Sequence, residues 1–220
     1  MEKHRKRTLF IFIILLILAL FISIKIYNSD PNFMLIDQRI LEAFISVRSE
    51  LLTKFMKIIS NLADKYFVIA TLFILMIIET FKKDRKPKYS VSIIILLFLT
   101  LLLRNFLKAY IGRIRPDLSY ALIYEDAFSF PSGHAQFATV YYGVFILLLD
   151  RKRNLFRKKR IVKFLQLLLL LLIILVGTSR LYLGVHYFFD VFAGIILGIM
   201  MIILFNQILV EYSQRNGTSK

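Results

Sequence analysis

The chain has 220 residues, of which 58% are apolar, and its mean hydropathy is +0.69. A soluble domain has about 45 to 50% apolar residues, so this composition excludes an ordinary water-soluble enzyme. Thirty lysines and arginines against 14 acidic residues give a formal charge of +16, which in a soluble protein would suggest nucleic-acid binding. Here most basic residues lie in blocks between apolar runs, a pattern typical of membrane topology, so we expect no nucleic-acid partner.

Six apolar runs are each long enough to cross the ~30 Å hydrocarbon layer as a helix. The first follows four basic residues and has no small-residue cleavage site after it, so we interpret it as an uncleaved anchor. The runs cover about residues 8–27, 62–81, 90–107, 132–149, 161–176 and 191–210. We therefore predict an all-α fold, a bundle of six transmembrane helices, in a single integral-membrane domain over residues 1–220.

Apolar residues also recur with a helical period between the first two spans, over about residues 33–60, and charged residues occupy the other faces. The pattern predicts one or two amphipathic helices lying on the extracytoplasmic membrane surface. A short helical cap packed on the bundle would give the same pattern and is the alternative.

Lysines and arginines near the ends of spans mark the cytoplasmic side of a bundle. Five lie in residues 82–88 and eight in 150–163, after the four at the N-terminus. Residues 28–61 balance four basic residues with four acidic ones, and 108–131 and 177–190 carry few charges. We therefore expect both termini in the cytoplasm and these last three segments outside.

Ionisable residues collect in the two smaller outward segments, where their cost near a membrane makes them functional candidates. Lys108 and Arg115 are seven residues apart, which predicts that they share one helix face and can bind one anion. Pro116 would then end that helix. Arg104 and Arg113 are interpreted as side chains that reach the lipid headgroups.

The other polar residues suggest a phosphate site with a nucleophile. Pro131, Ser132 and Gly133 lead into the fourth span, where free backbone N–H groups and the Ser132 hydroxyl can bind phosphate. Gly133 would let the backbone approach closely. His186 and Asp190 are four residues apart, so on a helix the carboxylate could hold one imidazole nitrogen and leave the other free to attack.

A divalent metal ion is a second interpretation, because His134, His186 and Asp190 are suitable ligands. However, Arg180 and the two cations of the preceding segment are expected in the same pocket. They would repel a dication and would bind a phosphate dianion through charge-assisted hydrogen bonds. We therefore favour phosphate and expect no metal.

Three stretches resemble the signature motifs of a known family. They are KAYIGRIRP (Lys108 to Pro116), PSGH (Pro131 to His134) and SRLYLGVHYFFD (Ser179 to Asp190). All eleven fixed positions of the motifs KxxxxxxRP, PSGH and SRxxxxxHxxxD of the type 2 phosphatidic acid phosphatase (PAP2) superfamily are present, in order. The six predicted spans resemble its integral-membrane lipid phosphatase branch, which includes bacterial phosphatidylglycerophosphatases and undecaprenyl diphosphate phosphatases, rather than its soluble members.

This resemblance implies a role for each matching residue. His186 would attack phosphorus to form a phosphohistidine, Asp190 would orient its ring, and His134 would protonate the leaving oxygen and then activate water. The residues implied to bind the phosphoryl oxygens are Lys108, Arg115, Ser132, Gly133 and Arg180. Those implied to support the pocket are Ser179, Pro131 and Pro116. The resemblance implies no metal and no other cofactor.

The resemblance, taken with the predicted topology, implies hydrolysis of a membrane lipid phosphate at the extracytoplasmic face of a bacterial inner membrane. Undecaprenyl diphosphate is the first candidate substrate, followed by phosphatidylglycerophosphate and phosphatidate. A lipid-to-lipid phosphotransferase shares the first half-reaction and stays open as an alternative. A non-catalytic carrier of anionic lipids is a second alternative, although it gives no reason for the two histidines. The expected partners are the lipid substrate and the bilayer, and the oligomeric state is left open.

Overall fold

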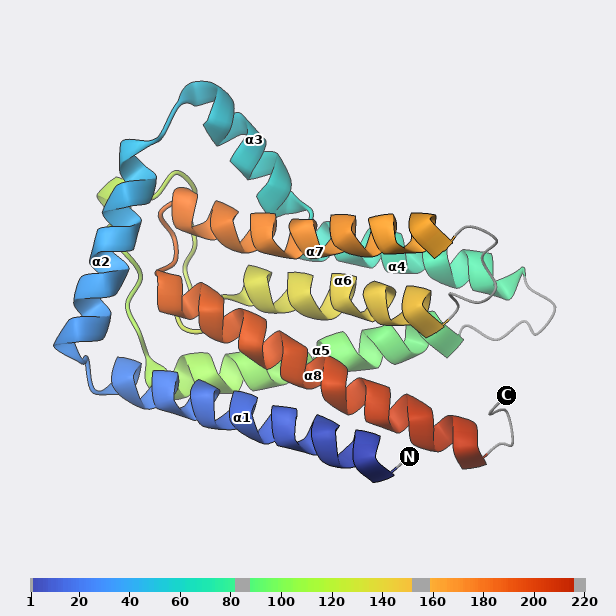
Figure 1. Ribbon diagram of the computed structural model, residues 1–220. Coiled ribbons are helices and arrows are strands. Elements are labelled where there is room, and N and C mark those ends of the chain that lie inside the picture. Colours follow the sequence, from blue (N-terminus) through green and yellow to red (C-terminus); the bar gives the residue numbers. More distant parts are fainter. Residues whose placement is uncertain (1, 82–87, 152–158, 216–220) are drawn as a thin grey trace.

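The structure, a computed structural model, describes residues 2–81, 88–151 and 159–215. Within these ranges the chain forms eight α-helices and one short 3-10 turn, with no strand, so the all-α prediction is confirmed (Figure 1). The elements are α1 Glu2–Tyr27, α2 Pro31–Ser46, α3 Glu50–Asn61, α4 Lys65–Thr80, α5 Lys88–Ile111, η1 Leu118–Tyr120, α6 Gly133–Arg151, α7 Lys159–Tyr182 and α8 Phe188–Arg215.

Helix α6 forms the centre of the bundle and packs against α5, α7 and α8. Helix α4 contacts α5, and α1 packs along α8, as Figure 1 shows for the second pair. The approach of α8 to α6 is close because small residues line it: a Cβ at Gly194 would lie 2.6 Å from the carbonyl oxygen of Ser132. This contact fixes the start of α6 against the start of α8.

Four of the described helices, α1, α5, α7 and α8, are long and apolar enough to cross a membrane. The number is five if α3 and α4, which meet at a bend of 48°, form one broken span. Helix α6 is not among them, because polar residues such as His134 and Gln136 occupy its first turn. Each of the six predicted runs lies on a helix, but the six-span arrangement itself stays a prediction.

The amphipathic segment between the first two spans forms two helices. Asp30 caps α2 by accepting the N–H of Asn32 over 3.1 Å, and Ser49 caps α3 by accepting that of Leu52 over 3.3 Å. Helix α2 crosses one end of the bundle and contacts α1, α7 and α8, and α3 packs on α7 (Figure 1). This packing agrees with the alternative interpretation of the segment as a helical cap.

Two local predictions about helices are wrong. Helix α5 ends at Ile111, because Gly112 adopts a left-handed conformation with φ +64°, so Lys108 and Arg115 do not share a helix face. Helix α8 begins at Phe188, so His186 precedes it. The basic segments 82–88 and 150–163 lie largely outside the described residues, so the orientation of the bundle stays a prediction.

Candidate active site

Two loops meet at the end of the bundle that α2 crosses. The first loop, residues 112–132, joins α5 to α6, and the second loop, residues 183–187, joins α7 to α8. Arg48, between α2 and α3, donates hydrogen bonds to the carbonyl of Tyr120 over 2.8 Å and to that of Tyr182 over 2.7 Å. One side chain of the cap therefore ties the first loop to the start of the second.

His186 lies in the second loop, and only 2% of its surface is exposed. Its Nδ1 is 3.5 Å from Oδ2 of Asp190, a distance longer than that of a tight hydrogen bond. Its Nε2 is 3.2 Å from Nη1 of Arg115. Because a guanidinium can only donate, Nε2 presents its lone pair to Arg115, and the ring proton belongs on Nδ1. The predicted His–Asp pair is thus formed without a helix beneath His186.

Four groups surround the buried carboxylate of Asp190. The Ser129 hydroxyl and the Tyr187 N–H donate to Oδ2, on which Nδ1 of His186 also converges. Arg113 donates to Oδ1 over 2.7 Å. These donors hold Asp190 as an anion in a fixed orientation toward the imidazole.

Arg113 connects this carboxylate to the cap. Its Nη1 binds Asp190, and its Nη2 donates to Oδ2 of Asp37 on α2 over 2.6 Å. Only 7% of the Arg113 side chain is exposed, and neither carboxylate is exposed at all. The interpretation of Arg113 as a headgroup-reaching side chain is therefore wrong, because two buried anions require this cation as their partner.

Glu125 of the first loop joins two of the predicted phosphate-binding cations. Arg180, at the end of α7, donates to Oε1 of Glu125 and, over 2.6 Å, to the Ser60 hydroxyl of α3. Nη2 of Arg115 lies 3.4 Å from Oε2 of the same carboxylate, and Nε of Arg115 donates to the Ala127 carbonyl over 2.6 Å. Burial lowers the pKa of Arg115, and the charge of Glu125 opposes that effect. The carboxylate thus lies between these two guanidinium groups.

Several further donors lie at the same place. Lys108, in the last turn of α5, donates to the Phe128 carbonyl. Among the residues that the structure describes, four side chains have buried polar atoms without a hydrogen-bond partner: Oγ of Ser132, Nε of Arg180, Nδ1 of His186 and the amide nitrogen and oxygen of Gln136. Helix α6 begins at Gly133, one residue after the predicted start of the fourth span, so the N–H groups of its first turn are directed to this end of the bundle. These donors suit a tetrahedral oxyanion.

The second histidine lies in the first turn of α6. His134 is close enough to Arg180, His186 and Arg115 for their charges to act on it. The two loops and three helix ends therefore bring together His134, the His186–Asp190 pair and the cations that the motifs indicate.

The residues predicted to support the pocket lie close by. Ser179 is buried, and its hydroxyl donates to the Val176 carbonyl within α7 over 2.7 Å. Pro116 follows Arg115 in the first loop, and the peptide bond between Phe130 and Pro131 is cis. Ser179 is thus engaged within its own helix.

Metal-ligating geometry is a separate question. In residues 2–81, 88–151 and 159–215, no group of three or more His, Cys, Asp or Glu side chains could hold a metal ion. The side chains that surround the two histidines are mainly arginine, which repels metal ions and attracts anions.

Sequence reasoning missed four polar residues of this region: Asp37, Arg113, Ser129 and Glu125. Asp37 lies one helical turn before the buried Leu41, so a carboxylate on the apolar face of the 33–60 segment was a usable signal. The other three lie in the first loop, which has no periodicity from which the direction of a side chain can be predicted.

Comparison with known proteins identifies relatives of the chain. The PAP2 superfamily matches residues 88–213. Phosphatidylglycerophosphatase B of Bacillus subtilis is 32% identical over 169 residues, which cover 76% of this chain and 80% of that protein. Lipid A 1-phosphatase of Rhizobium etli is 34% identical over 106 residues, which are 44% of this chain and 40% of that protein.

Two crystal structures resemble the fold. A transmembrane PAP2-type phosphatidylglycerolphosphate phosphatase from Bacillus subtilis has a TM-score of 0.82 at 26% identity, over 91% of this chain and 96% of that one. LpxE from Aquifex aeolicus has a TM-score of 0.60 at 25% identity, over 78% of this chain and 94% of that one.

Proposed function

Because the chain belongs to the PAP2 superfamily, we propose that it hydrolyses the phosphate or diphosphate headgroup of a membrane lipid through a phosphohistidine intermediate. The observation that carries this proposal is the geometry of His186. Its Nε2 faces a cationic cluster, with Arg115 at 3.2 Å, while its Nδ1 faces the anchored carboxylate of Asp190. A neutral imidazole held in this way is an oriented nucleophile directed at an anion site.

In the proposed mechanism, Nε2 of His186 forms a bond to phosphorus as the bond from phosphorus to the leaving oxygen breaks. His134 gives its proton to that oxygen and then takes a proton from the water that hydrolyses the intermediate. Asp190 stabilises the charge that develops on His186. The groups that bind the phosphoryl oxygens and stabilise the transition state are Lys108, Arg115, Arg180, the Ser132 hydroxyl and the Gly133 backbone. No step requires a metal ion.

A lipid substrate is supported by an apolar groove between α4 and α5. Side chains of both helices line it, including Val68, Leu72, Leu97 and Leu101, and Phe137 of α6 lies at its base. Phe137 is one helical turn after the catalytic candidate His134. A hydrocarbon chain lying in this groove would place its phosphate near the first turn of α6.

We propose the remaining features as the sequence predicts them. The chain is one integral-membrane domain over residues 1–220 with six spans, cytoplasmic termini and an extracytoplasmic site in a bacterial membrane. Undecaprenyl diphosphate is the first candidate substrate, ahead of phosphatidylglycerophosphate and phosphatidate.

Phosphate release by the purified protein tests the activity. With excess chelator, we expect release from at least one of undecaprenyl diphosphate, phosphatidylglycerophosphate and phosphatidate. No release from any of them would contradict the proposal, and release only without chelator would contradict metal independence.

Rapid quenching with a labelled substrate tests the nucleophile. A labelled phosphoenzyme should form in the unchanged protein and be absent in His186→Asn. It should form in His134→Asn but turn over more slowly, by about 10²-fold or more. His4→Asn is the matched control, since His4 is the one histidine outside the three motifs. Label retained in His186→Asn would refute the assignment.

A further inference from the structure

Arg104 lies on α5 one helical turn before Lys108, at the border of the site. Its side chain packs over Gly133: a Cβ there would lie 2.6 Å from Nη1 and 3.0 Å from Cδ of Arg104. The guanidinium also lies over the ring of Phe137, 5.1 Å from its centroid. Arg104 is therefore held against the first turn of α6, and its interpretation as a side chain that reaches the headgroups does not describe this position.

The charge of Arg104 is not neutralised by an ion pair. Its Nε and Nη2 donate to the neutral amide oxygen of Asn105 over 3.3 and 3.1 Å. In the part of the chain that the structure describes, no carboxylate lies within ion-pair distance of it, unlike Arg113, Arg115 and Arg180. The charges of Arg104 and Lys108 repel each other, and the charge of Glu125 offsets part of this repulsion, so an anion bound near both cations would stabilise them further.

The position of Arg104 beside the α4–α5 groove indicates which part of a lipid substrate it would meet. Phe137 is shared: it lines the α4–α5 groove and carries Arg104 above its ring. The contacts therefore run from the apolar groove through Phe137 to the guanidinium of Arg104, and from Arg104 to Gly133, the residue before His134. A lipid with two phosphorus groups has the same order, with its chain first, then the phosphate that stays on the product, then the terminal phosphate that is removed.

We propose that Arg104 is a specificity residue that binds the non-reacting phosphate of such lipids, the inner phosphate of a polyprenyl diphosphate or the phosphodiester of phosphatidylglycerophosphate. This inference rests on the proposed function and extends it. A lipid monophosphate has no anion at this position. Arg104 therefore contributes to its turnover only by long-range electrostatic attraction, without a direct contact.

Two substrates that differ by one phosphate test the proposal. The purified full chain is assayed with farnesyl diphosphate and farnesyl monophosphate, which share the same hydrocarbon chain. Arg104→Gln should lower kcat/KM for the diphosphate by about 10- to 100-fold, as expected for losing a charge-assisted hydrogen bond, and for the monophosphate by less than about 3-fold. Arg104→Lys, which keeps the charge but loses the planar fork, should give an intermediate loss for the diphosphate.

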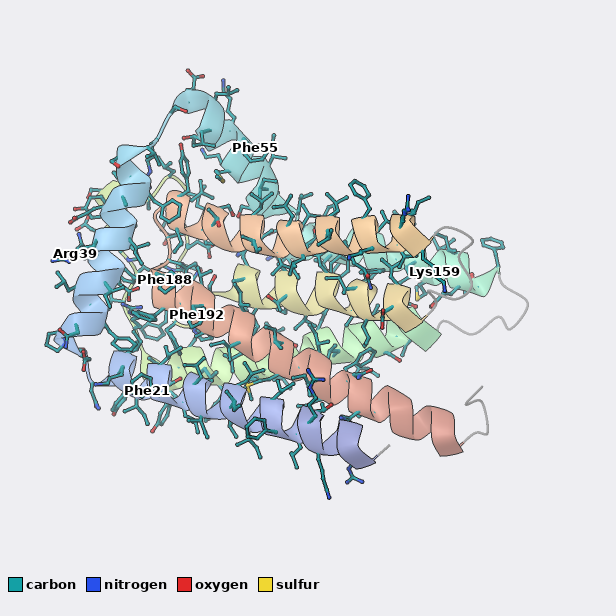
Figure 2. The ribbon with its side chains drawn as sticks, in the orientation of Figure 1. Phe21, Arg39, Phe55, Lys159, Phe188 and Phe192 are labelled. Carbon is teal, nitrogen blue, oxygen red and sulfur yellow. The ribbon has the colours of Figure 1, made fainter. Side chains whose placement is uncertain are left out.

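Arg39→Gln is the matched control, because Arg39 is exposed on α2 and points away from the bundle (Figure 2). It should leave the ratio of the two kcat/KM values unchanged. Equal losses for both substrates in Arg104→Gln, or no loss for either, would overturn the inference even though the unchanged protein is active.

A binding measurement distinguishes failure of this inference from failure of the proposed function. Protection against thermal unfolding is measured with farnesyl methylenediphosphonate and farnesyl phosphonate, which are not hydrolysed. The unchanged protein should be protected more by the first, and Arg104→Gln should lose that difference. A protein that hydrolyses neither farnesyl substrate would refute the activity toward them, and this binding difference would still decide the role of Arg104.

Discussion

At the scale of single residues, burial lowers the pKa of the His186 imidazole to about 3, the charge of Arg115 adds to this effect, and Asp190 opposes it. The free protein should therefore hold His186 neutral at pH 5, where an ordinary histidine with a pKa near 6.5 is mostly charged. Nitrogen NMR of histidine-labelled protein checks this, with the signal identified by its loss in His186→Asn. A charged His186 at pH 5 would mean that the site is open to water.

Arg113 should act on the rate through Asp190. Replacing Arg113 by Gln removes a donor from the carboxylate that orients the nucleophile, so we expect kcat to fall by about 10- to 100-fold, the range found for partners of this kind. Asp37→Asn weakens only the contact between Arg113 and α2. The contact between Arg113 and Asp190 stays, so kcat should fall by a smaller factor. Steady-state kinetics with both variants measures the difference, and an equal fall would show a general structural effect.

The change Arg113→Gln also leaves two buried carboxylates without a cation, which destabilises a protein by about 3 to 5 kcal/mol. The double change Arg113→Gln with Asp37→Asn removes one of these charges. It should therefore recover part of the thermal stability but none of the lost kcat. Recovery of both together would contradict a specific action of Arg113 on Asp190.

Glu125 should compete with phosphate, because it binds Arg180 and lies 3.4 Å from Arg115. Glu125→Gln removes this negative charge and should lower the inhibition constant of inorganic phosphate by about 3- to 10-fold, equivalent to roughly 1 kcal/mol for a partly exposed ion pair. Asp126→Asn, a change at the neighbouring residue, is the control. Weaker phosphate binding in Glu125→Gln would show that the carboxylate positions the arginines instead.

At the scale of elements, the two glycines with positive φ shape the loops of the site. Gly184 has φ +72°, and a Cβ there would lie 2.1 Å from the Tyr120 carbonyl oxygen, a backbone atom that cannot move aside easily. Gly112 has φ +64°, but a Cβ there would meet nothing within 4 Å. The second loop can therefore approach the first only with glycine at position 184.

Alanine substitutions at these two glycines should distinguish the effect of backbone strain from the effect of a steric clash. Gly112→Ala carries only the left-handed backbone strain, about 1 to 2 kcal/mol. Gly184→Ala adds a collision with the first loop two residues before His186, and should lower both the midpoint of thermal unfolding and the activity much further. Thermal unfolding in detergent, together with phosphate release, measures both. Equal effects would mean that the loops move apart without consequence.

The elements that could be predicted from the sequence are those with a strong pattern. Long apolar runs predicted the positions of the major helices, and the fourth run predicted a start near Ser132, one residue before α6 begins at Gly133. The end of α5 was assigned to Pro116, although Gly112 was already a usual helix-ending residue. The direction of Arg113 and Glu125 could not be predicted, because it is decided by carboxylates and cations that are distant in sequence.

At the scale of the whole molecule, α6 explains why fewer helices are apolar enough to count as spans than the six that the sequence predicts. It is enclosed by α5, α7 and α8, and residues in its first turns, such as Ala135, Gln136 and Thr139, are buried inside the protein. A helix that faces other helices can carry polar residues at membrane depth when protein groups or a bound ligand satisfy them. The Thr139 hydroxyl donates to the Ala135 carbonyl over 2.7 Å, whereas the buried Gln136 amide has no hydrogen-bond partner among the described residues. The polar start of α6 is thus compatible with a sixth span that presents its donors to a phosphate.

The orientation of the bundle is the last prediction, and the absence of cysteine makes it directly testable. Ser46 is exposed at the end of α2, beside the site, and Lys159 is exposed where α7 begins, at the opposite end of the bundle (Figure 2). In intact cells, a membrane-impermeant maleimide should label Ser46→Cys and leave Lys159→Cys unlabelled, because the basic segments are predicted to lie in the cytoplasm. Both variants should react after the membrane is opened. Labelling of Lys159→Cys alone in intact cells would place the site on the cytoplasmic side, where it would meet lipids of the inner leaflet.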